Sequence, residues 1–191
     1  RRSGATWTLD ATLTPPSITA GAFLLSSDGS TLVSANILDP PWPNSGSAHV
    51  FQRTNGVWRF EASLGPDPEF MWQQLGFDGQ LSADGNRLVL GASAESLASP
   101  DGSVIDAHGA VYIFTRSGES WVRSLRVPAP AGIRSLLFGR SVSCSADGRA
   151  VLVGEPGGST GAPGINGDML KPALPNSGSV YLFRITEVGG P

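Results

Sequence analysis

The side chains that could do chemistry are few and lie far apart in the sequence. The two histidines are His49 and His108, the single cysteine is Cys144, and Glu155 is an isolated carboxylate. Hydrolysis needs a nucleophile, a base and a group that orients the base, and His108 has one acidic residue nearby, Asp106. Zinc sites need clustered cysteine and histidine ligands, and the sequence has no such cluster. We therefore predict a protein that is not an enzyme and uses no metal and no cofactor.

Large apolar residues stand instead in segments rich in proline and glycine, which are typical of loops. Loops run over the protein surface, and tryptophan, phenylalanine and methionine are enriched in the cores of protein interfaces. The alternative is that Trp42 and Trp72 fold back and cover sheet edges. We add His108 and its neighbour Asp106 to these apolar residues. The predicted binding residues are Trp42, Phe70, Met71, Trp72, Asp106, His108 and Met169.

The composition indicates a single folded domain. Of 191 residues only 15% are charged, while 25 are Gly and 15 are Pro, which is typical of a protein rich in turns. Eight Phe and five Trp argue against disorder, because disordered segments have few aromatic residues. The net charge is −3 and the 13 cations are scattered, which argues against a nucleic-acid partner, since duplex binders carry a basic patch. No apolar run approaches the roughly 20 residues of a membrane span.

Three sequence markers recur in the same order and indicate internal repeats. An Asp-Gly pair between two apolar runs predicts a tight hairpin, because glycine adopts positive φ at little cost. The repeats span approximately residues 1–54, 55–117 and 118–186. The markers are Trp7, Trp58 and Trp121; Asp28-Gly29, Asp84-Gly85 and Asp147-Gly148; and Phe51, Phe114 and Phe183.

Each repeat is expected to form four short strands, and no segment has a convincing helical period. Four antiparallel strands in tandem repeats are typical of β-propeller blades, so we predict an all-β fold of three blades. A solenoid or a β-sandwich is the alternative. The expected strands are 23–26, 79–82 and 141–145 (first); 31–35, 88–91 and 150–154 (second); 48–51, 111–114 and 180–183 (third); and 7–13, 58–64 and 121–127 (fourth).

Two of the candidate chemical residues fall inside these expected strands. His49 occupies the third-strand position held by Tyr112 and Tyr181 in the other repeats, so we interpret it as a packing or hydrogen-bonding residue. Cys144 falls in a first strand, where Leu25 and Leu81 stand in the other repeats. A small buried apolar role is therefore expected for it.

The third repeat resembles a known unit, the FG-GAP repeat of integrin-α-like propellers. The resemblance rests on Leu137-Phe138-Gly139, on Val151-Leu152-Val153-Gly154-Glu155-Pro156 and on Gly178-Ser179-Val180-Tyr181-Leu182-Phe183. The second repeat is looser, with Leu75-Gly76 at the Phe-Gly position, and the first has Thr19-Ala20 there. The resemblance implies a propeller, an extracellular or cell-surface location and a role in adhesion.

Repeats of this family often carry a calcium loop of the form Asp-x-Asp-x-Asp-Gly. The corresponding turns here contain one carboxylate each, Asp28, Asp84 and Asp147. Calcium takes six to eight oxygen ligands, several of them charged. We therefore interpret these turns as plain hairpins without metal.

Three blades do not close a propeller, which has about four to eight. The sequence also begins on a strand of the fourth type, 7–13, and its last expected strand is of the third type. Three explanations are open: the chain is part of a longer propeller, two copies join head to tail and exchange the 7–13 strand, or a different chain completes the ring. Each explanation leaves unpaired sheet edges in the isolated chain, so we expect either a partner or a missing segment.

The longest expected loops lie on one face, which we call the long-loop face. It comprises residues 36–45, 93–108 and 155–177 together with 14–21, 65–74 and 128–135. Long insertions on one face of a repeat protein usually mark its binding side. We predict a non-catalytic interaction module that binds a protein or a glycan there. The alternatives are a structural subunit or fragment of a large assembly and, in a different class, a propeller hydrolase or lyase.

Overall fold

The described part of the chain is built of β-strands and turns. The computed structural model describes residues 2–3, 6–17, 21–40, 44–98, 104–130, 137–158, 164–165 and 177–186. These ranges contain no helix, and accordingly no helix within them is long and apolar enough to span a membrane. The chain is therefore all-β over the residues that the structure describes.

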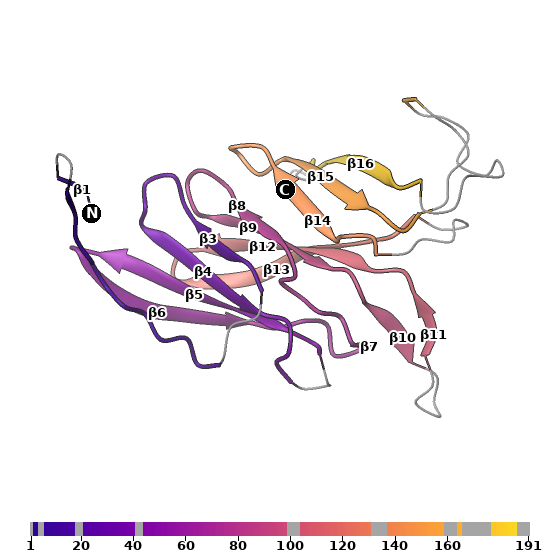
Figure 1. Ribbon diagram of the computed structural model, residues 1–191, viewed down its shortest axis with the longest axis horizontal. Helices are drawn as coiled ribbons and strands as arrows, with labels where there is room; N and C mark the ends of the chain where they lie inside the picture. Colours follow the sequence, from indigo (N-terminus) through magenta and orange to yellow (C-terminus); the bar gives the residue numbers. More distant parts are fainter. Residues whose placement is uncertain are drawn as a thin grey trace, which may run out of the picture.

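Three antiparallel sheets follow one another along the chain, and in each the strands are neighbours in sequence order (Figure 1). The first two have four strands and the third has three. We call them blades 1, 2 and 3. Blade 1 is β3 (Phe23–Leu25), β4 (Thr31–Asn36), β5 (Ser47–Thr54) and β6 (Val57–Leu64); blade 2 is β8 (Gly79–Leu81), β9 (Arg87–Ala92), β12 (Ala110–Ser117) and β13 (Ser120–Pro128); blade 3 is β14 (Ser141–Cys144), β15 (Ala150–Glu155) and β16 (Ser179–Arg184).

The blades repeat one another in register as well as in order. Phe51 pairs with Leu32 in blade 1, and Phe114 pairs with Leu88 at the same place in blade 2. A register irregularity immediately precedes each of these phenylalanines, where the third strand meets the fourth. The sheets are therefore copies of one unit, as the recurring markers predict.

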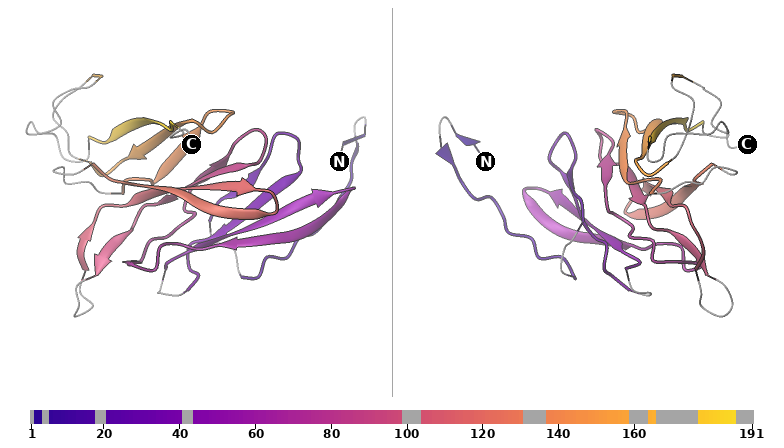
Figure 2. Two further views of the ribbon diagram at one scale, coloured as in Figure 1. Left: turned by 180° about the vertical axis from the view of Figure 1, so that it is seen from behind. Right: turned by 45° about the vertical axis from the view of Figure 1, so that its right-hand side comes forward.

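The blades pack face against face in succession, with blade 2 between the other two. One apolar cluster joins residues such as Val50 of blade 1 to Leu88 and Tyr112 of blade 2. A second joins Ile113, on the opposite face of blade 2, to Phe138 and to blade 3. Figure 2 shows the three sheets fanned side by side rather than stacked as two layers. This serial packing is that of propeller blades.

Glycine at the entry to the third strand makes this close packing possible. Gly46 and Gly109 adopt φ of 84° and 82°. A Cβ atom on Gly46 would lie 2.4 Å from the carbonyl oxygen of Leu75, and one on Gly109 would lie 2.2 Å from that of Phe138. Leu75 and Phe138 are the fully buried residues that precede the Gly of the Phe-Gly position. Blades 2 and 3 therefore each seat the segment at the Phe-Gly position on the entry glycine of the blade before.

The three Asp-Gly turns are hairpins with one shared geometry. In the second turn, Ser82 Oγ donates to Asp84 Oδ1 at 2.6 Å and accepts from the backbone N–H of Arg87. The other two turns repeat both contacts. The turns also connect the blades, because Ala83 N–H donates to the carbonyl of Ala146 at 2.8 Å.

The expected fourth-type strand over 7–13 is wrong in its extent. Only Thr6–Trp7 (β2) is a strand, and it pairs with Arg2–Ser3 (β1), whereas residues 8–13 belong to no strand. The physical reason is that a strand requires a neighbouring edge, and within the described residues no third-type strand lies alongside this segment. Blade 3 correspondingly has three described strands, and β16 pairs there with β15.

Candidate interaction surface

Five of the seven predicted binding residues lie in, or directly after, the strands of one small sheet on the long-loop face. This sheet, which we call the loop sheet, has the strand order β11-β10-β7. It projects from blade 2 at the end opposite the Asp-Gly turns (Figure 1). Its strands are β7 (Phe70–Met71), β10 (Ser96–Ala98) and β11 (Val104–Ala107).

The loop sheet joins two loops that lie far apart in the sequence. Phe70 pairs with Leu97, and Leu97 pairs on its other side with Asp106. Trp72 directly follows β7, and the partly buried His108 directly follows β11. The two other predicted residues, Trp42 and Met169, lie outside the described residues, and their role stays a prediction.

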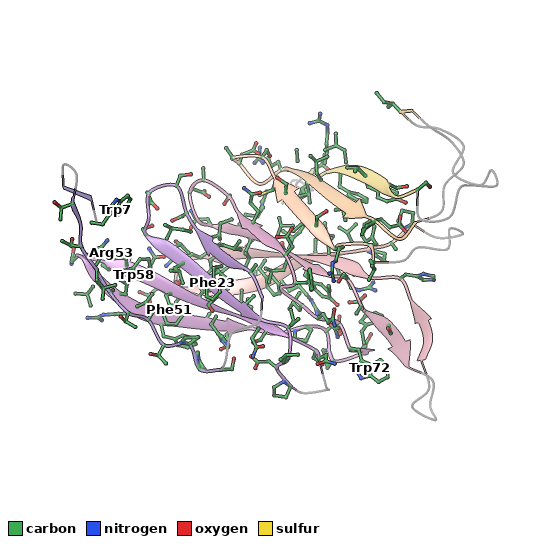
Figure 3. The ribbon with its side chains drawn as sticks, in the orientation of Figure 1. Trp7, Phe23, Phe51, Arg53, Trp58 and Trp72 are labelled. Atoms are coloured by element: carbon green, nitrogen blue, oxygen red, sulfur yellow. The ribbon has the colours of Figure 1, made fainter. Side chains whose placement is uncertain are left out.

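Trp72 is a large apolar residue that is exposed on this surface. Its side chain is 42% exposed and lies at the outer end of the molecule next to β7 (Figure 3). Its φ is 50°, a region that bulky residues seldom adopt. Such local strain persists only where the surroundings over-determine it, and it concentrates at binding sites. The chain therefore holds an exposed indole in a conformation that is locally unfavourable.

Hydrogen bonds of the two residues that follow Trp72 hold this conformation in place. Gln73 is fully buried, and its side-chain amide donates to the carbonyl of Phe70 at 2.8 Å. The N–H of Gln74, which also has positive φ, donates to the carbonyl of Asn44 at 2.8 Å. The neighbours of the indole are thus anchored inward, and the indole is directed outward.

A charged cluster forms a rigid base beneath the loop sheet. The Arg126 guanidinium lies 4.0 Å from the centre of the Phe70 ring and pairs with Glu95, which also accepts a hydrogen bond from Tyr112. Burial raises the pKa of the Glu95 carboxyl, against the opposing effect of Arg126 and Tyr112. Arg123 pairs with Asp67 at 3.0 Å. Phe70 is therefore part of the base, and Trp72 is the more accessible of the two aromatic residues.

In every blade the residue at the tyrosine position contacts a carboxylate. Tyr181 donates to Glu155 at 2.7 Å, and in blade 1 His49 Nε2 lies 3.3 Å from Asp39 Oδ2. In blade 3 the carboxylate comes from a strand residue, Glu155 at the end of β15. The carboxyl group lies close to Gly158, where a Cβ would be 2.8 Å from its carbon. Sequence reasoning placed His49 in the tyrosine position and named Glu155 as an isolated carboxylate, but it missed Asp39, Glu95 and the contact that all three carboxylates make. The one available signal is an acidic residue at or just after each second strand.

The surroundings of His49 bear on the hydrolase alternative. Ser17 Oγ lies 2.9 Å from Nε2, the nitrogen that also faces Asp39, and Ser63 Oγ lies 3.0 Å from Nδ1. In a catalytic triad the nucleophile and the carboxylate stand on opposite ring nitrogens, so Ser17 does not fit that order and Ser63 alone is placed opposite Asp39. A blade position that holds tyrosine twice and histidine once indicates a packing role.

Cys144 lies on β14 and is half-buried. Burial, with a contribution from the nearby carboxylate of Asp147, raises the pKa of its thiol. The nucleophilic form of cysteine is the thiolate, so this environment disfavours reactivity. The described residues contain no group of three or more histidine, cysteine or acidic side chains arranged to hold a metal ion.

Comparisons with known proteins add little beyond this geometry. No model of a protein family matches the sequence, and no curated protein matches it either. Among solved structures, TolB from Acinetobacter baumannii is similar over 88% of this chain and 33% of its own, with 14% sequence identity and a TM-score of 0.39. The chain thus spans about a third of the length of that protein. The assignment of the three sheets as blades rests on their strand order, register and packing.

Proposed function

We propose that this chain is a non-catalytic propeller module of the FG-GAP type that binds a protein partner, or a glycan, through the long-loop face. The observation that carries the proposal is Trp72: it is exposed, held at positive φ and placed at the end of the loop sheet. Tryptophan is enriched among the residues that dominate binding energy. A single indole presented in this way is suited to fill a pocket on a partner.

The base beneath the loop sheet supports this proposal, because it fixes the surface before a partner arrives. Arg126 links Glu95 of one loop to Phe70 of the other, and Gln73 ties the turn to buried backbone. Binding by a preformed surface loses less conformational entropy than binding by a flexible loop. A preformed surface therefore reaches a given affinity with a smaller contact area than a flexible loop needs.

Two alternatives use the same residues differently. In a structural subunit of a large assembly, the loop sheet would be covered permanently and Trp72 would be part of a fixed joint. In a hydrolase or lyase, the cluster of Asp39, His49 and Ser63 would be the reacting group. We favour the interaction module over the hydrolase because the exposed Trp72, with its strained backbone, belongs neither to the apolar clusters between blades nor to the hydrogen bonds of His49. A permanently covered Trp72 would favour the assembly instead. A cell-surface, adhesive role follows from the FG-GAP resemblance and is part of the proposal.

The proposal can be tested by selecting ligands for the chain and then comparing how tightly they bind two single-residue variants. Immobilised chain is used to select binders from a random peptide library displayed on phage, and in parallel it is probed on a glycan array. The selected ligands are then measured against Trp72→Ala and against Val122→Ala, a matched control whose exposed apolar side chain lies on β13. Loss of a central aromatic contact weakens binding by about 2 kcal/mol or more, or roughly 30-fold.

The expected result is that Trp72→Ala loses the selected ligands and Val122→Ala keeps them. Absence of any enriched ligand, or ligands that bind Trp72→Ala as tightly as the parent chain, would contradict the proposal. Ester hydrolysis that disappears in Ser63→Ala would favour the hydrolase alternative instead.

A further inference from the structure

Blade 2 has an arginine at a fourth-strand position where blade 1 has a serine. Arg126 on β13 pairs with Tyr112, whereas in blade 1 Ser63 on β6 pairs with His49, the residue at the tyrosine position. The loop sheet projects from blade 2, the blade that carries the arginine (Figure 1). The arginine therefore coincides with the loop sheet and is not part of the pattern that the two blades share.

Arg126 contacts both of the loops that form the loop sheet. Its Nε donates to Glu95 Oε1 at 2.9 Å, and Glu95 directly precedes β10. Its guanidinium also lies 4.0 Å from the centre of the Phe70 ring on β7. The backbone ladder between β7 and β10 is short, since it has only two residue pairs. The side-chain contacts of Arg126 therefore help to hold β7 in place, and with it Trp72, which directly follows β7.

The two members of this ion pair differ in their access to water. The Glu95 side chain is 2% exposed and the Arg126 side chain is 27% exposed. Glu95 also accepts a hydrogen bond from Tyr112, and a protonated carboxyl group keeps acceptor capacity for such a bond. Arginine stays charged at every pH of interest. Loss of the charge on Glu95 would therefore leave Arg126 without its counter-charge, and its exposed side gives it a route into water.

The charged and titratable groups that act on Glu95 come from three elements. They are Arg126 on β13, Tyr112 on β12 and Asp67 in the segment before β7. Burial raises the pKa of the Glu95 carboxyl, Asp67 adds to this rise, and Arg126 and Tyr112 oppose it. A carboxyl group whose pKa is raised by folding favours the native state as the pH falls through that pKa. Protonation of Glu95 therefore does not by itself unfold the chain.

We propose that Arg126 is a positioning residue for the Trp72 surface, acting through Phe70 and Glu95, and that protonation of Glu95 releases it. At neutral pH the ion pair holds the two loops together and keeps the indole in its outward position. In weakly acidic solution Glu95 is neutral, Arg126 turns toward water and β7 loses this support. The inference rests on the proposed function, because it assigns the regulation of the same surface. The surface then binds its partner at neutral pH and releases it in acid.

Fluorine NMR of the chain labelled with 5-fluorotryptophan tests this inference without any ligand. The Trp72 resonance, identified by its loss in Trp72→Phe, is expected to shift or broaden between pH 7.5 and pH 4.5. In Glu95→Gln and Arg126→Gln it is expected to stay near its acid position at every pH. Arg126→Lys keeps the charge and is expected to restore part of the pH dependence.

Two control variants assign the pH dependence to Glu95. Glu61→Gln removes the acid from another arginine–carboxylate pair of blade 2, in which Arg116 Nε donates to Glu61 Oε1 at 2.9 Å. His108→Asn removes the titratable side chain that directly follows β11. Both variants are expected to leave the titration of the Trp72 resonance unchanged. Thermal melts at both ends of the pH range show that each variant is folded.

Peptides selected at pH 7.5 as described under Proposed function test the consequence for binding. Their dissociation constants are expected to rise roughly 10-fold at pH 5, a size within the usual range of coupling between two sites, and to be weak at both pH values in Glu95→Gln. A Trp72 resonance that ignores pH, or that still titrates in Glu95→Gln, overturns the inference and leaves the proposed function standing. Peptides that need Trp72 but bind equally at both pH values overturn it as well. The fluorine titration decides the inference even where the selection yields no peptide.

Discussion

The joint between blades can be tested at a single glycine. Gly109 enters β12 with φ of 82°, and a Cβ there would lie 2.2 Å from the carbonyl oxygen of Phe138 in the next blade. Ordinary van der Waals contact begins near 3.4 Å, so the contact is about 1.2 Å too short and the blades must separate. The oxygen belongs to a backbone whose Phe138 ring packs edge-on against Tyr181 and Phe183. Gly109→Ala should therefore disturb the whole second apolar cluster.

The size of the effect follows from two separate contributions. An alanine in the left-handed region costs roughly 1–2 kcal/mol, and inserting a methyl group into a packed core costs about 1–3 kcal/mol more. Gly118→Ala provides the matched control. Gly118 lies just beyond the other end of β12 and also has positive φ, at 63°. A Cβ atom added there would have no neighbouring atom within 4 Å. Only the first contribution applies to the control. The difference between the two variants, about 1–3 kcal/mol, isolates the contact between blades.

Guanidinium unfolding followed by tryptophan fluorescence measures this difference, and calorimetry provides a second readout. For a chain of this length the difference corresponds to about 3–9 °C in Tm. If Gly109→Ala and Gly118→Ala lose the same stability, blade 3 does not pack on blade 2 as described. A loss confined to Gly118→Ala would contradict the reasoning equally.

Two further predictions concern titratable groups. Hydrogen bonds from Ser26, Ser82 and Ser145, the first cause in each turn, lower the pKa of Asp28, Asp84 and Asp147. A carboxylate whose pKa is lowered by folding stabilises the native state at pH values above about 4, which is its pKa in the unfolded chain. This stabilisation is lost as the pH falls through the pKa of the folded state. Unfolding measured between pH 2 and 7 should show the loss of stability, and Ser82→Ala should make that loss smaller. Burial raises the pKa of the Cys144 thiol. A disulfide reagent at pH 8 should therefore react more slowly with Cys144 in the native chain than in the chain unfolded in guanidinium. Equal reaction rates in the two states would contradict a half-buried thiol.

The strands were predictable because their signals are local. The run at 88–91 is continuously apolar and follows an Asp-Gly turn, and β9 forms at Arg87–Ala92 around it. The same reasoning finds the first and third strands of each blade near their observed bounds. A hairpin turn and the alternation beside it lie within a few residues of each other, so no knowledge of distant contacts is needed.

The loop sheet was not predictable as a sheet, although its residues were singled out. Phe70 pairs with Leu97. This pairing joins two loops that are separated in the sequence by strands β8 and β9 of blade 2. The positive φ of Trp72 has no sequence signal, because bulky residues seldom adopt it. It follows from how Gln73 and Gln74 are anchored, which only the three-dimensional arrangement defines.

The 7–13 segment shows the opposite case, in which the sequence pattern predicts more strand than the structure forms. Its match to 58–64 predicts an outer strand, yet residues 8–13 form none. The ion pair of Asp10 with Arg53 nevertheless holds it in the place of such a strand. Within the described residues no strand edge lies alongside residues 8–13, so the pattern alone does not produce a strand there.

A crystal structure of the purified chain tests the central claim most directly. It is expected to show the three sheets packed face against face in succession, with the middle sheet contributing one face to each apolar cluster. Sheets stacked as two layers, or a chain with substantial helix, would contradict the description of the three repeats as propeller blades.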